Sequence, residues 1–144
     1  MKMTILATLA ATMIIALPLA AQQGNPGAHF IENWDLDGDG KVTIEEATQK
    51  RGEIFYMFDQ DQSGALEPVE YDLFDEARNA DMAENAGGPG GPMKGVSQGM
   101  VREFNDVDGD GKVSEEEFRS RAIDWFAMMD GDGDGLVTTE DFMR

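Results

Sequence analysis

The amino-acid sequence predicts an all-α protein built from helix-loop-helix units, and two observations carry this prediction. Apolar residues recur at positions i, i+1 and i+4 before three acidic segments, at 30, 31 and 34, at 54, 55 and 58, and at 125, 126 and 129. This spacing is typical of one apolar face of a helix. In addition, four segments of twelve residues share one arrangement of acids, a glycine and an aliphatic residue. The repeat places an acidic loop after each predicted helix.

Each twelve-residue loop offers the oxygen atoms that a calcium ion needs from one continuous segment. Positions 1, 3 and 5 supply side-chain oxygens, position 7 a backbone carbonyl and position 12 a bidentate acid, while glycine at position 6 permits a sharp turn. The predicted metal ligands are Asp35, Asp37, Asp39, Lys41 and Glu46 in loop one; Asp59, Asp61, Ser63, Ala65 and Glu70 in loop two; Asp106, Asp108, Asp110, Lys112 and Glu117 in loop three; and Asp130, Asp132, Asp134, Leu136 and Asp141 in loop four.

The four loops are not equivalent. Loops one and three are nearly identical, each with a hydroxyl at position 9 to hold a water, and we expect them to bind best. Loop two has Ser63 at position 5 but gains an acid, Glu67, at position 9. Loop four ends in Asp141, whose side chain is one methylene shorter than that of Glu. We therefore expect loop four to be the weakest site and the most tolerant of Mg²⁺.

A simpler interpretation of these segments is that they are turns and helix caps. Thr43 with Glu46, Ser114 with Glu117, and Thr138 with Asp141 have the spacing of capping boxes. The two interpretations are compatible, but a plain turn does not need three like charges within five residues. Because those carboxylates repel one another without a cation, the sequence favours metal binding, and it predicts that folding is coupled to it.

Charge and composition exclude several classes of function. The chain has 29 Asp and Glu against 11 Lys and Arg, a net charge of −18, which argues against binding nucleic acid or an anionic membrane. It has no Cys, and its one histidine, His29, suits surface packing better than catalysis. With no histidine pair, thiol or phosphate-binding loop, we expect no enzymatic activity.

The N-terminal residues resemble an export signal. Lys2 precedes an apolar run from 5 to 17, and Ala21 ends a segment of small residues, so we expect cleavage after Ala21. The rival interpretation is a permanent membrane anchor, but the apolar run of about 13 residues is short of the roughly 20 needed to cross a bilayer. We expect a periplasmic or secreted protein with no stable membrane anchor, divided into 1–21 signal peptide, 22–83 first two units, 84–97 Gly/Pro-rich linker and 98–144 last two units.

On these loops and helices, the chain resembles the EF-hand superfamily over roughly residues 28 to 144. The resemblance implies that loops pair through a short β-bridge at position 8, here Val42, Leu66, Val113 and Val137. Loops one and two, and loops three and four, start 24 residues apart, so residues 45 to 58 can form only one shared helix about 20 Å long. Loops that are adjacent in sequence are then too far apart to pair with each other. We predict that loop two pairs with three and loop one with four, in one compact domain with the linker as a flexible tether; if the linker instead separates two lobes, this pairing fails.

The compressed spacing and the export signal also resemble lanmodulin, a lanthanide-binding member of the superfamily. Lanmodulin loops favour Pro at position 2, where this chain has Leu36, Gln60, Val107 and Gly131, and an acid at position 9, which only loop two provides. Dockerin modules repeat calcium loops at a similar interval, but the aromatic-rich helices here differ from them. We therefore favour up to four Ca²⁺ ions, with lanthanides as the alternative.

Two further expectations concern the helices and the role of the metal. The apolar pattern slips before loop three, where Asn105 occupies the position of Trp34, Phe58 and Met129 in the other units, so this helix should pack differently. The helix after loop four is a stub of about three residues. Met57, Met100, Met128 and Met129 either fill the core or line a groove for a protein partner. Methionines that fill the core predict a calcium buffer, whereas methionines that line a groove predict a calcium sensor.

Overall fold

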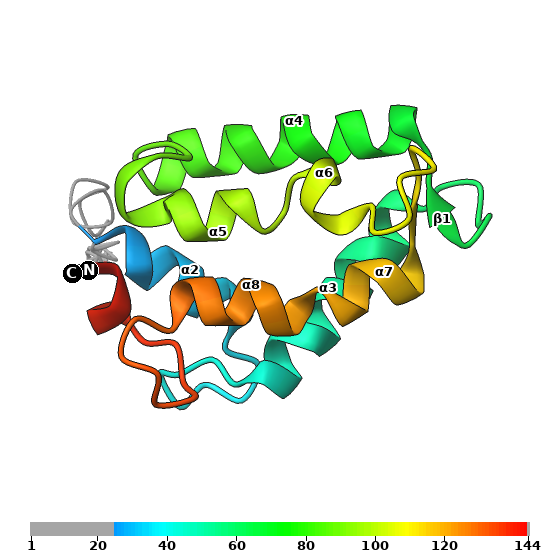
Figure 1. Ribbon diagram of the computed structural model, residues 1–144. Coiled ribbons are helices and arrows are strands. Elements are labelled where there is room, and N and C mark those ends of the chain that lie inside the picture. Colours follow the sequence, from blue (N-terminus) through cyan, green and yellow to red (C-terminus); the bar gives the residue numbers. More distant parts are fainter. Residues whose placement is uncertain (1–24, 144) are drawn as a thin grey trace, which may run out of the picture.

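Helices make up most of the described chain, which covers residues 25–143 of a computed structural model (Figure 1). The predicted all-α class is confirmed. The elements in order are α2 (Pro26–Trp34), α3 (Ile44–Phe58), β1 (Ala65–Leu66), α4 (Pro68–Asn85), η1 (Gly91–Met93), α5 (Lys94–Gln98), α6 (Arg102–Asn105), β2 (Val113–Ser114), α7 (Glu115–Ser120), α8 (Ala122–Met129) and η2 (Thr139–Met143). The predicted signal peptide, 1–21, lies outside the described residues. Within the described part, no helix is both long and apolar enough to cross a membrane.

A single helix, α3, connects loops one and two, as the 24-residue spacing predicts. Its N-terminus is a capping box, in which the Thr43 hydroxyl accepts the Glu46 N–H and the Glu46 carboxylate accepts the Thr43 N–H. It ends at Phe58, directly before the first ligand position of loop two. With 15 residues it is about 22 Å long, so the two loops at its ends are too far apart to pair with each other.

The loops pair as predicted, two with three and one with four. β1 and β2 are antiparallel, with Leu66 opposite Val113. Val42 and Val137 form the second bridge, in which each N–H donates to the other residue's carbonyl at 2.9 Å. All four position-8 residues are completely buried. The two pairs lie toward opposite ends of the molecule, and each joins segments remote in sequence (Figure 1).

One continuous hydrophobic core lies between the two loop pairs. Near loops one and four, Trp34 packs against Trp125 with ring centroids 4.7 Å apart, and Phe30 contacts Phe142 at 5.3 Å. Near loops two and three, Phe74 packs edge-on against Phe58, Tyr71 and Phe118. All these rings belong to a single packed cluster with their neighbours. The prediction of one compact domain is therefore confirmed.

The linker prediction is wrong for its second half. Residues 84–97 were expected to form a flexible tether, yet η1 and α5 occupy 91–98, and the side chains of Met93 and Val96 are buried in the core. The sequence offers no periodicity over this short stretch because two buried residues three positions apart are too few to define a helical face. Gly87 and Gly88, with φ of 74° and 102°, turn the chain before it.

The slip in the apolar pattern before loop three is explained by a buried polar network. Asn105 and Arg51 are both fully buried. Arg51 donates through Nη2 to the Asn105 side-chain oxygen, through Nε to the Phe118 carbonyl at 2.7 Å and through Nη1 to the Gly99 carbonyl at 3.2 Å. The Asn105 amide donates to the Tyr71 hydroxyl at 3.1 Å. Burial lowers the pKa of Arg51 to about 9. The guanidinium lies 4.2 Å from the Phe118 ring centroid, and its partners in this network are uncharged.

Two glycines mark close helix packing, and substitution at them should have very different effects. A Cβ at Gly99 would lie 1.8 Å from Cδ1 of the buried Trp125 ring, whereas a Cβ at Gly52 would lie 2.3 Å from the mobile end of Arg119. We expect Gly99→Ala to lower the free energy of unfolding by about 3 kcal/mol. Gly52→Ala should cost less than about 1 kcal/mol, because Arg119 can move aside and alanine favours the helix. Urea unfolding in excess calcium measures both, and equal losses would contradict this packing.

Candidate metal centres

Each of the four loops brings three carboxylates together. One oxygen of each acid in a group lies within 4.8 Å of the others. The groups are Asp35, Asp37 and Asp39; Asp59, Asp61 and Glu70; Asp106, Asp108 and Glu117; and Asp130, Asp132 and Asp141. Hence twelve of the predicted ligands converge. Glu46, Asp110 and Asp134 are predicted ligands that lie outside these tightest groups.

Backbone N–H groups hold the first acid of each loop in place. In loop one, Gly38 and Gly40 donate to the two oxygens of Asp35, both at 2.7 Å. Asp106 accepts the same pair from Gly109 and Gly111, and Asp130 from Gly133 and Gly135. In loop two, Asp59 accepts from Ser63 and Gly64, each at 3.0 Å. The backbone of each loop therefore orients the first carboxylate toward the centre of that loop.

The closing acid is held the same way in every loop, including loop four. Glu46 accepts the Leu36 N–H through Oε1 and the Thr43 N–H through Oε2, each at 2.9 Å. Asp141 accepts the equivalent Gly131 and Thr138 N–H groups at 3.0 and 2.9 Å. Asp141 lies in the 3-10 helix η2, whereas the three Glu residues lie in the first turn of α-helices. We infer that the tighter helix compensates for the shorter side chain; the lower affinity of loop four stays a prediction.

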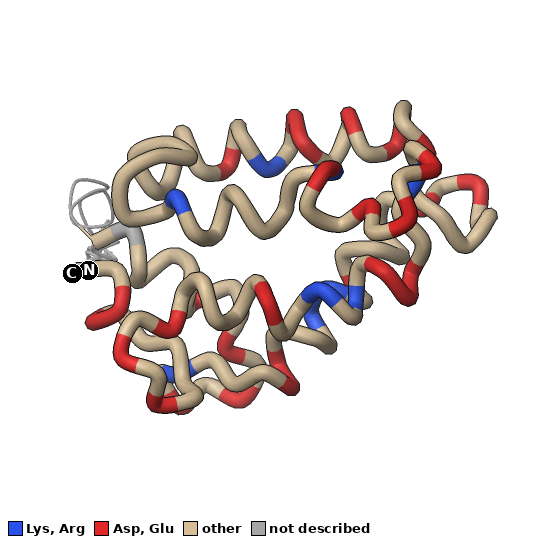
Figure 2. The backbone as a smooth tube through the Cα atoms, viewed as in Figure 1, with Lys and Arg blue, Asp and Glu red and all other residues tan. Residues whose placement is uncertain are grey.

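Two ligand carboxylates of loop one have pKa values that are shifted in opposite directions. Desolvation raises the pKa of Asp35, but the N–H groups of Gly40, Gly38 and Asp39 together leave it below its usual value. At Asp37 the N–H of Asp39 lowers the pKa, yet desolvation and the charges of Asp39 and Glu46 leave it raised. Acidic positions are concentrated in the loops at both ends of the molecule (Figure 2). Oxygen donors with an excess of negative charge suit a hard divalent cation such as Ca²⁺.

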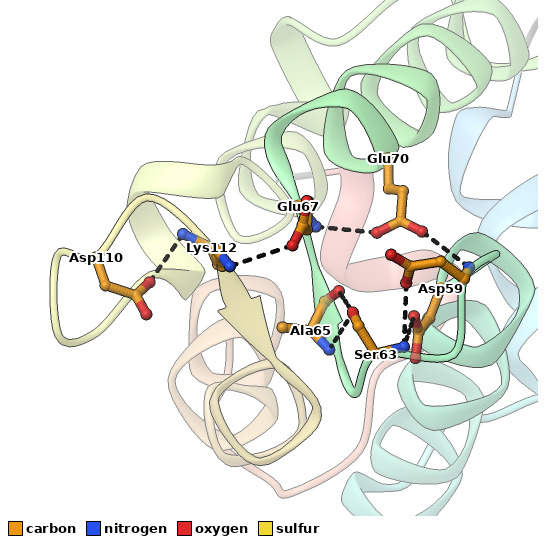
Figure 3. A network of polar contacts seen from close by, with 8 residues as sticks. Asp59, Ser63, Ala65, Glu67, Glu70, Asp110 and Lys112 are labelled. Atoms are coloured by element: carbon orange, nitrogen blue, oxygen red, sulfur yellow. Dashed lines mark hydrogen bonds and ion pairs between the residues drawn. The ribbon is translucent and has the colours of Figure 1, made fainter.

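Loops two and three share a contact that sequence reasoning missed. Lys112, expected to offer only its carbonyl, donates through Nζ to Oε1 of Glu67 at 3.1 Å (Figure 3). This hydrogen bond and the charge of Glu67 raise the pKa of Lys112. Glu67, at position 9 of loop two, thus contacts the paired loop. The two residues lie 45 positions apart in sequence and become neighbours only once the loops pair.

Two predicted ligand atoms of loop two face the same space. The Ser63 hydroxyl donates to the Ala65 carbonyl at 2.9 Å, beside Asp59 and Glu70 (Figure 3). A hydroxyl at position 5 is therefore close enough to the position-7 carbonyl for both to contact one ion. In loops one, three and four the position-5 acid accepts the position-7 N–H, at Lys41, Lys112 and Leu136, and in loop two the Ser63 hydroxyl likewise accepts the Ala65 N–H, at 3.4 Å.

Loop two also contains a strained residue, which gives a testable prediction. Gln62 has φ of 55°, whereas glycine occupies this position in the other loops at 72° to 77°. A side chain in the left-handed region costs about 1 kcal/mol, so we expect Gln62→Gly to raise the free energy of unfolding by about that amount. Gly133→Ala, the reverse change at the same position of loop four, meets no atom within 4 Å and should lower it similarly. Urea unfolding in excess calcium measures both variants. A lower free energy of unfolding in Gln62→Gly than in the unmodified chain would contradict the proposed strain at this residue.

Together, the paired loops and their converging acids define a metal-binding protein of helix-loop-helix units. The EF hand family model matches residues 32–46, 105–120 and 122–144, which contain loops one, three and four. The chain is therefore a member of the EF-hand calcium-binding superfamily. Loop two lies outside these matches; it has acids at positions 1, 3 and 12 like the other loops, with Ser63 at position 5 and Glu67 at position 9. No curated protein matches the chain.

Proposed function

We propose that this protein is an exported calcium-binding protein with one ion in each loop, and that metal binding completes its fold. The observation that carries the proposal is the pairing of loops remote in sequence. Loop one meets loop four and loop two meets loop three, so all four acidic clusters lie at the two junctions that close the domain. Unneutralised charge at those junctions opposes closure, and bound cations favour it.

The shared helix makes the response to metal a concerted one. In a sensor, calcium changes the angle between the helices that flank a loop. Here α3 follows loop one and precedes loop two, so a change of angle at one loop moves the helix of the other. This connection supports folding of the whole domain rather than the opening of one unit.

Titration calorimetry tests the proposal. Calcium, magnesium and a lanthanide are titrated separately into the same metal-free sample. We expect close to four calcium ions per chain, with weaker binding of magnesium. A lanthanide that binds far more tightly than calcium would favour the lanmodulin-like alternative, and two or fewer calcium ions would contradict the four-site proposal.

Of the two roles for the metal, a buffer is better supported than a sensor. Met82, Met93, Met100 and Met129 are buried in the core, whereas Met57 and Met128 are exposed. A sensor would gain exposed apolar surface when calcium binds. Retention on a phenyl column should therefore not increase with calcium, and a strong calcium-dependent increase would identify a sensor with a protein partner.

The export part of the proposal rests on residues 1–21, with Lys2, the apolar run and the small residues before the expected cut. Expression of the whole chain in a bacterial host, followed by mass spectrometry of the periplasmic fraction, tests it. The expected product begins at Gln22. An uncleaved product in the cytoplasm would contradict export while leaving metal binding unaffected.

A further inference from the structure

Glu67 and Lys112 lie directly opposite each other on the paired loops two and three. The antiparallel ladder of β1 and β2 places Leu66 opposite Val113. Continued by one residue, the same register places Glu67 opposite Lys112, and Nζ of Lys112 donates to Oε1 of Glu67 at 3.1 Å (Figure 3). Opposite charges in such cross-strand positions attract each other. The ion pair therefore joins position 9 of loop two to position 7 of loop three.

The equivalent positions of the other loop pair carry no opposite charges. Because Val42 pairs with Val137, the same register places Lys41, at position 7 of loop one, opposite Thr138, at position 9 of loop four. Thr138 is uncharged, and none of the ion pairs within residues 25–143 includes Lys41. The two lysines thus occupy the same position of nearly identical loops, and only one of them faces an acid.

The contact with Lys112 removes an acid from loop two. The acids that converge in this loop are Asp59, Asp61 and Glu70. Position 9 of a calcium loop acts on the ion, often through a water, and the number of charged ligands tunes the affinity. While its carboxylate accepts from Lys112, Glu67 serves the contact between the loops. Loop two then presents three acids to its ion, although its sequence contains four.

The ammonium group of Lys112 also lies close to ligand acids of both loops. Its hydrogen bond to Glu67 and the charge of Glu67 are the main causes of its raised pKa, and the charges of Asp110 and Asp61 add to them. Asp110 is a predicted ligand of loop three, and Asp61 is one of loop two. A positive charge beside these acids opposes the binding of a cation to them. Both side chains of the ion pair are about half exposed, so water screens the effect.

We propose that Lys112 of loop three lowers the cation affinity of loop two by holding Glu67 in the ion pair between the loops. The inference rests on the proposed calcium binding and adds to it a residue that sets the affinity of one loop from the neighbouring loop. Loop two is accordingly a weaker site than its four acids imply, and it releases its ion at a higher free calcium concentration than it would without Lys112.

One N–H group in each loop allows the release of calcium to be followed separately. The Gly64 N–H donates to Asp59 in loop two, and the Gly111 N–H donates to Asp106 in loop three. Free calcium is lowered stepwise with a chelator, starting from the calcium-saturated full chain, while the NMR signals of these groups are recorded. Lys112→Met should lower the free calcium concentration at which the Gly64 signal is half lost by about fivefold, the upper end for an exposed ion pair. The Gly111 midpoint should fall less than about twofold.

A double-mutant cycle separates the hold on Glu67 from the charge of Lys112 alone. In a Glu67→Gln background the lysine has no acid to hold, so Lys112→Met should lower the Gly64 midpoint less than about twofold. Lys41→Met removes the same charge at a position that faces Thr138. It measures the effect of charge alone, and the midpoint of loop one, recorded at Gly40, should fall less than about twofold.

Equal shifts from Lys112→Met in the two backgrounds would overturn the inference, because the lysine would then act only through its charge. A larger shift at Gly111 than at Gly64 would also overturn it, and so would equal effects of Lys112→Met and Lys41→Met. If all signals disappear together, the difference between the two backgrounds at their common midpoint decides instead. A chain that binds no calcium would overturn the proposed function as well, whereas four bound ions with equal shifts would overturn this inference alone.

Discussion

Removal of bound metal with a chelator is expected to unfold most of the helical structure. The four acidic clusters lie where remote segments meet, and α3 transmits a loss at one loop to the next. When free calcium is 100 times the dissociation constant, each site contributes about 2.7 kcal/mol, so four sites give about 11 kcal/mol. That is comparable with the whole stability of a small domain. Far-UV circular dichroism with and without chelator measures the change.

Added calcium should restore the helical signal in the same sample. The control for ionic strength is an equal concentration of sodium chloride, which screens exposed charges but does not occupy the loops. A chelated protein that retains its helical signal and its cooperative thermal transition would contradict metal-coupled folding. The assignment of the loops would survive that result, because calorimetry measures it separately.

Replacement of Arg51 should cause one of the largest losses of stability among single substitutions outside the loops. Arg51→Met keeps an unbranched apolar side chain but leaves the Asn105 side-chain oxygen and the Phe118 carbonyl without the donor that Arg51 supplies, whereas the Gly99 carbonyl still accepts from the Asn105 amide. Buried groups that lose a partner cost about 1–3 kcal/mol each, so we expect a loss of about 3 kcal/mol or more. Lys50→Met, on the adjacent and half-buried residue, should change stability by less than about 0.5 kcal/mol. Urea unfolding in excess calcium compares them.

A second variant, Asn105→Leu, tests the same buried network around Arg51. It restores the apolar residue that the other three units have before the loop, and it removes the main side-chain partner of Arg51. If the network is cooperative, the Arg51→Met, Asn105→Leu double variant should be more stable than the sum of the single losses implies. Additive losses, or a loss below about 1 kcal/mol in Arg51→Met, would show that the network contributes little.

Much of the metal site follows from local sequence because its ligands are local. All oxygens of one loop come from twelve consecutive residues, and the turn that arranges them depends on glycine at fixed positions. The converging acids of loop one and of loop three could therefore be identified without a structure. Loop pairing could also be predicted, since a single 15-residue helix between loops rules out the alternative.

What sequence reasoning missed depends on residues that are distant in the chain. The order of residues 91–98 comes from burial of Met93 and Val96 against helices that the segment meets only in the folded domain. From the sequence alone, Arg51 would be expected to be an ordinary exposed residue of a helix. It is buried because α3 crosses α7 at this point, where carbonyl groups and the Phe118 ring receive the guanidinium.

The sequence by itself determined the chemistry of this protein: an all-α chain with four oxygen-rich loops, in which a single helix connects loops one and two and the loops must pair across the molecule. These features depend on spacing within segments of up to about 25 residues. Tertiary structure alone decided two others: the Glu67–Lys112 contact between loops and the buried environment of Arg51. Each is formed by side chains from several elements, and their approach depends on how the whole core packs.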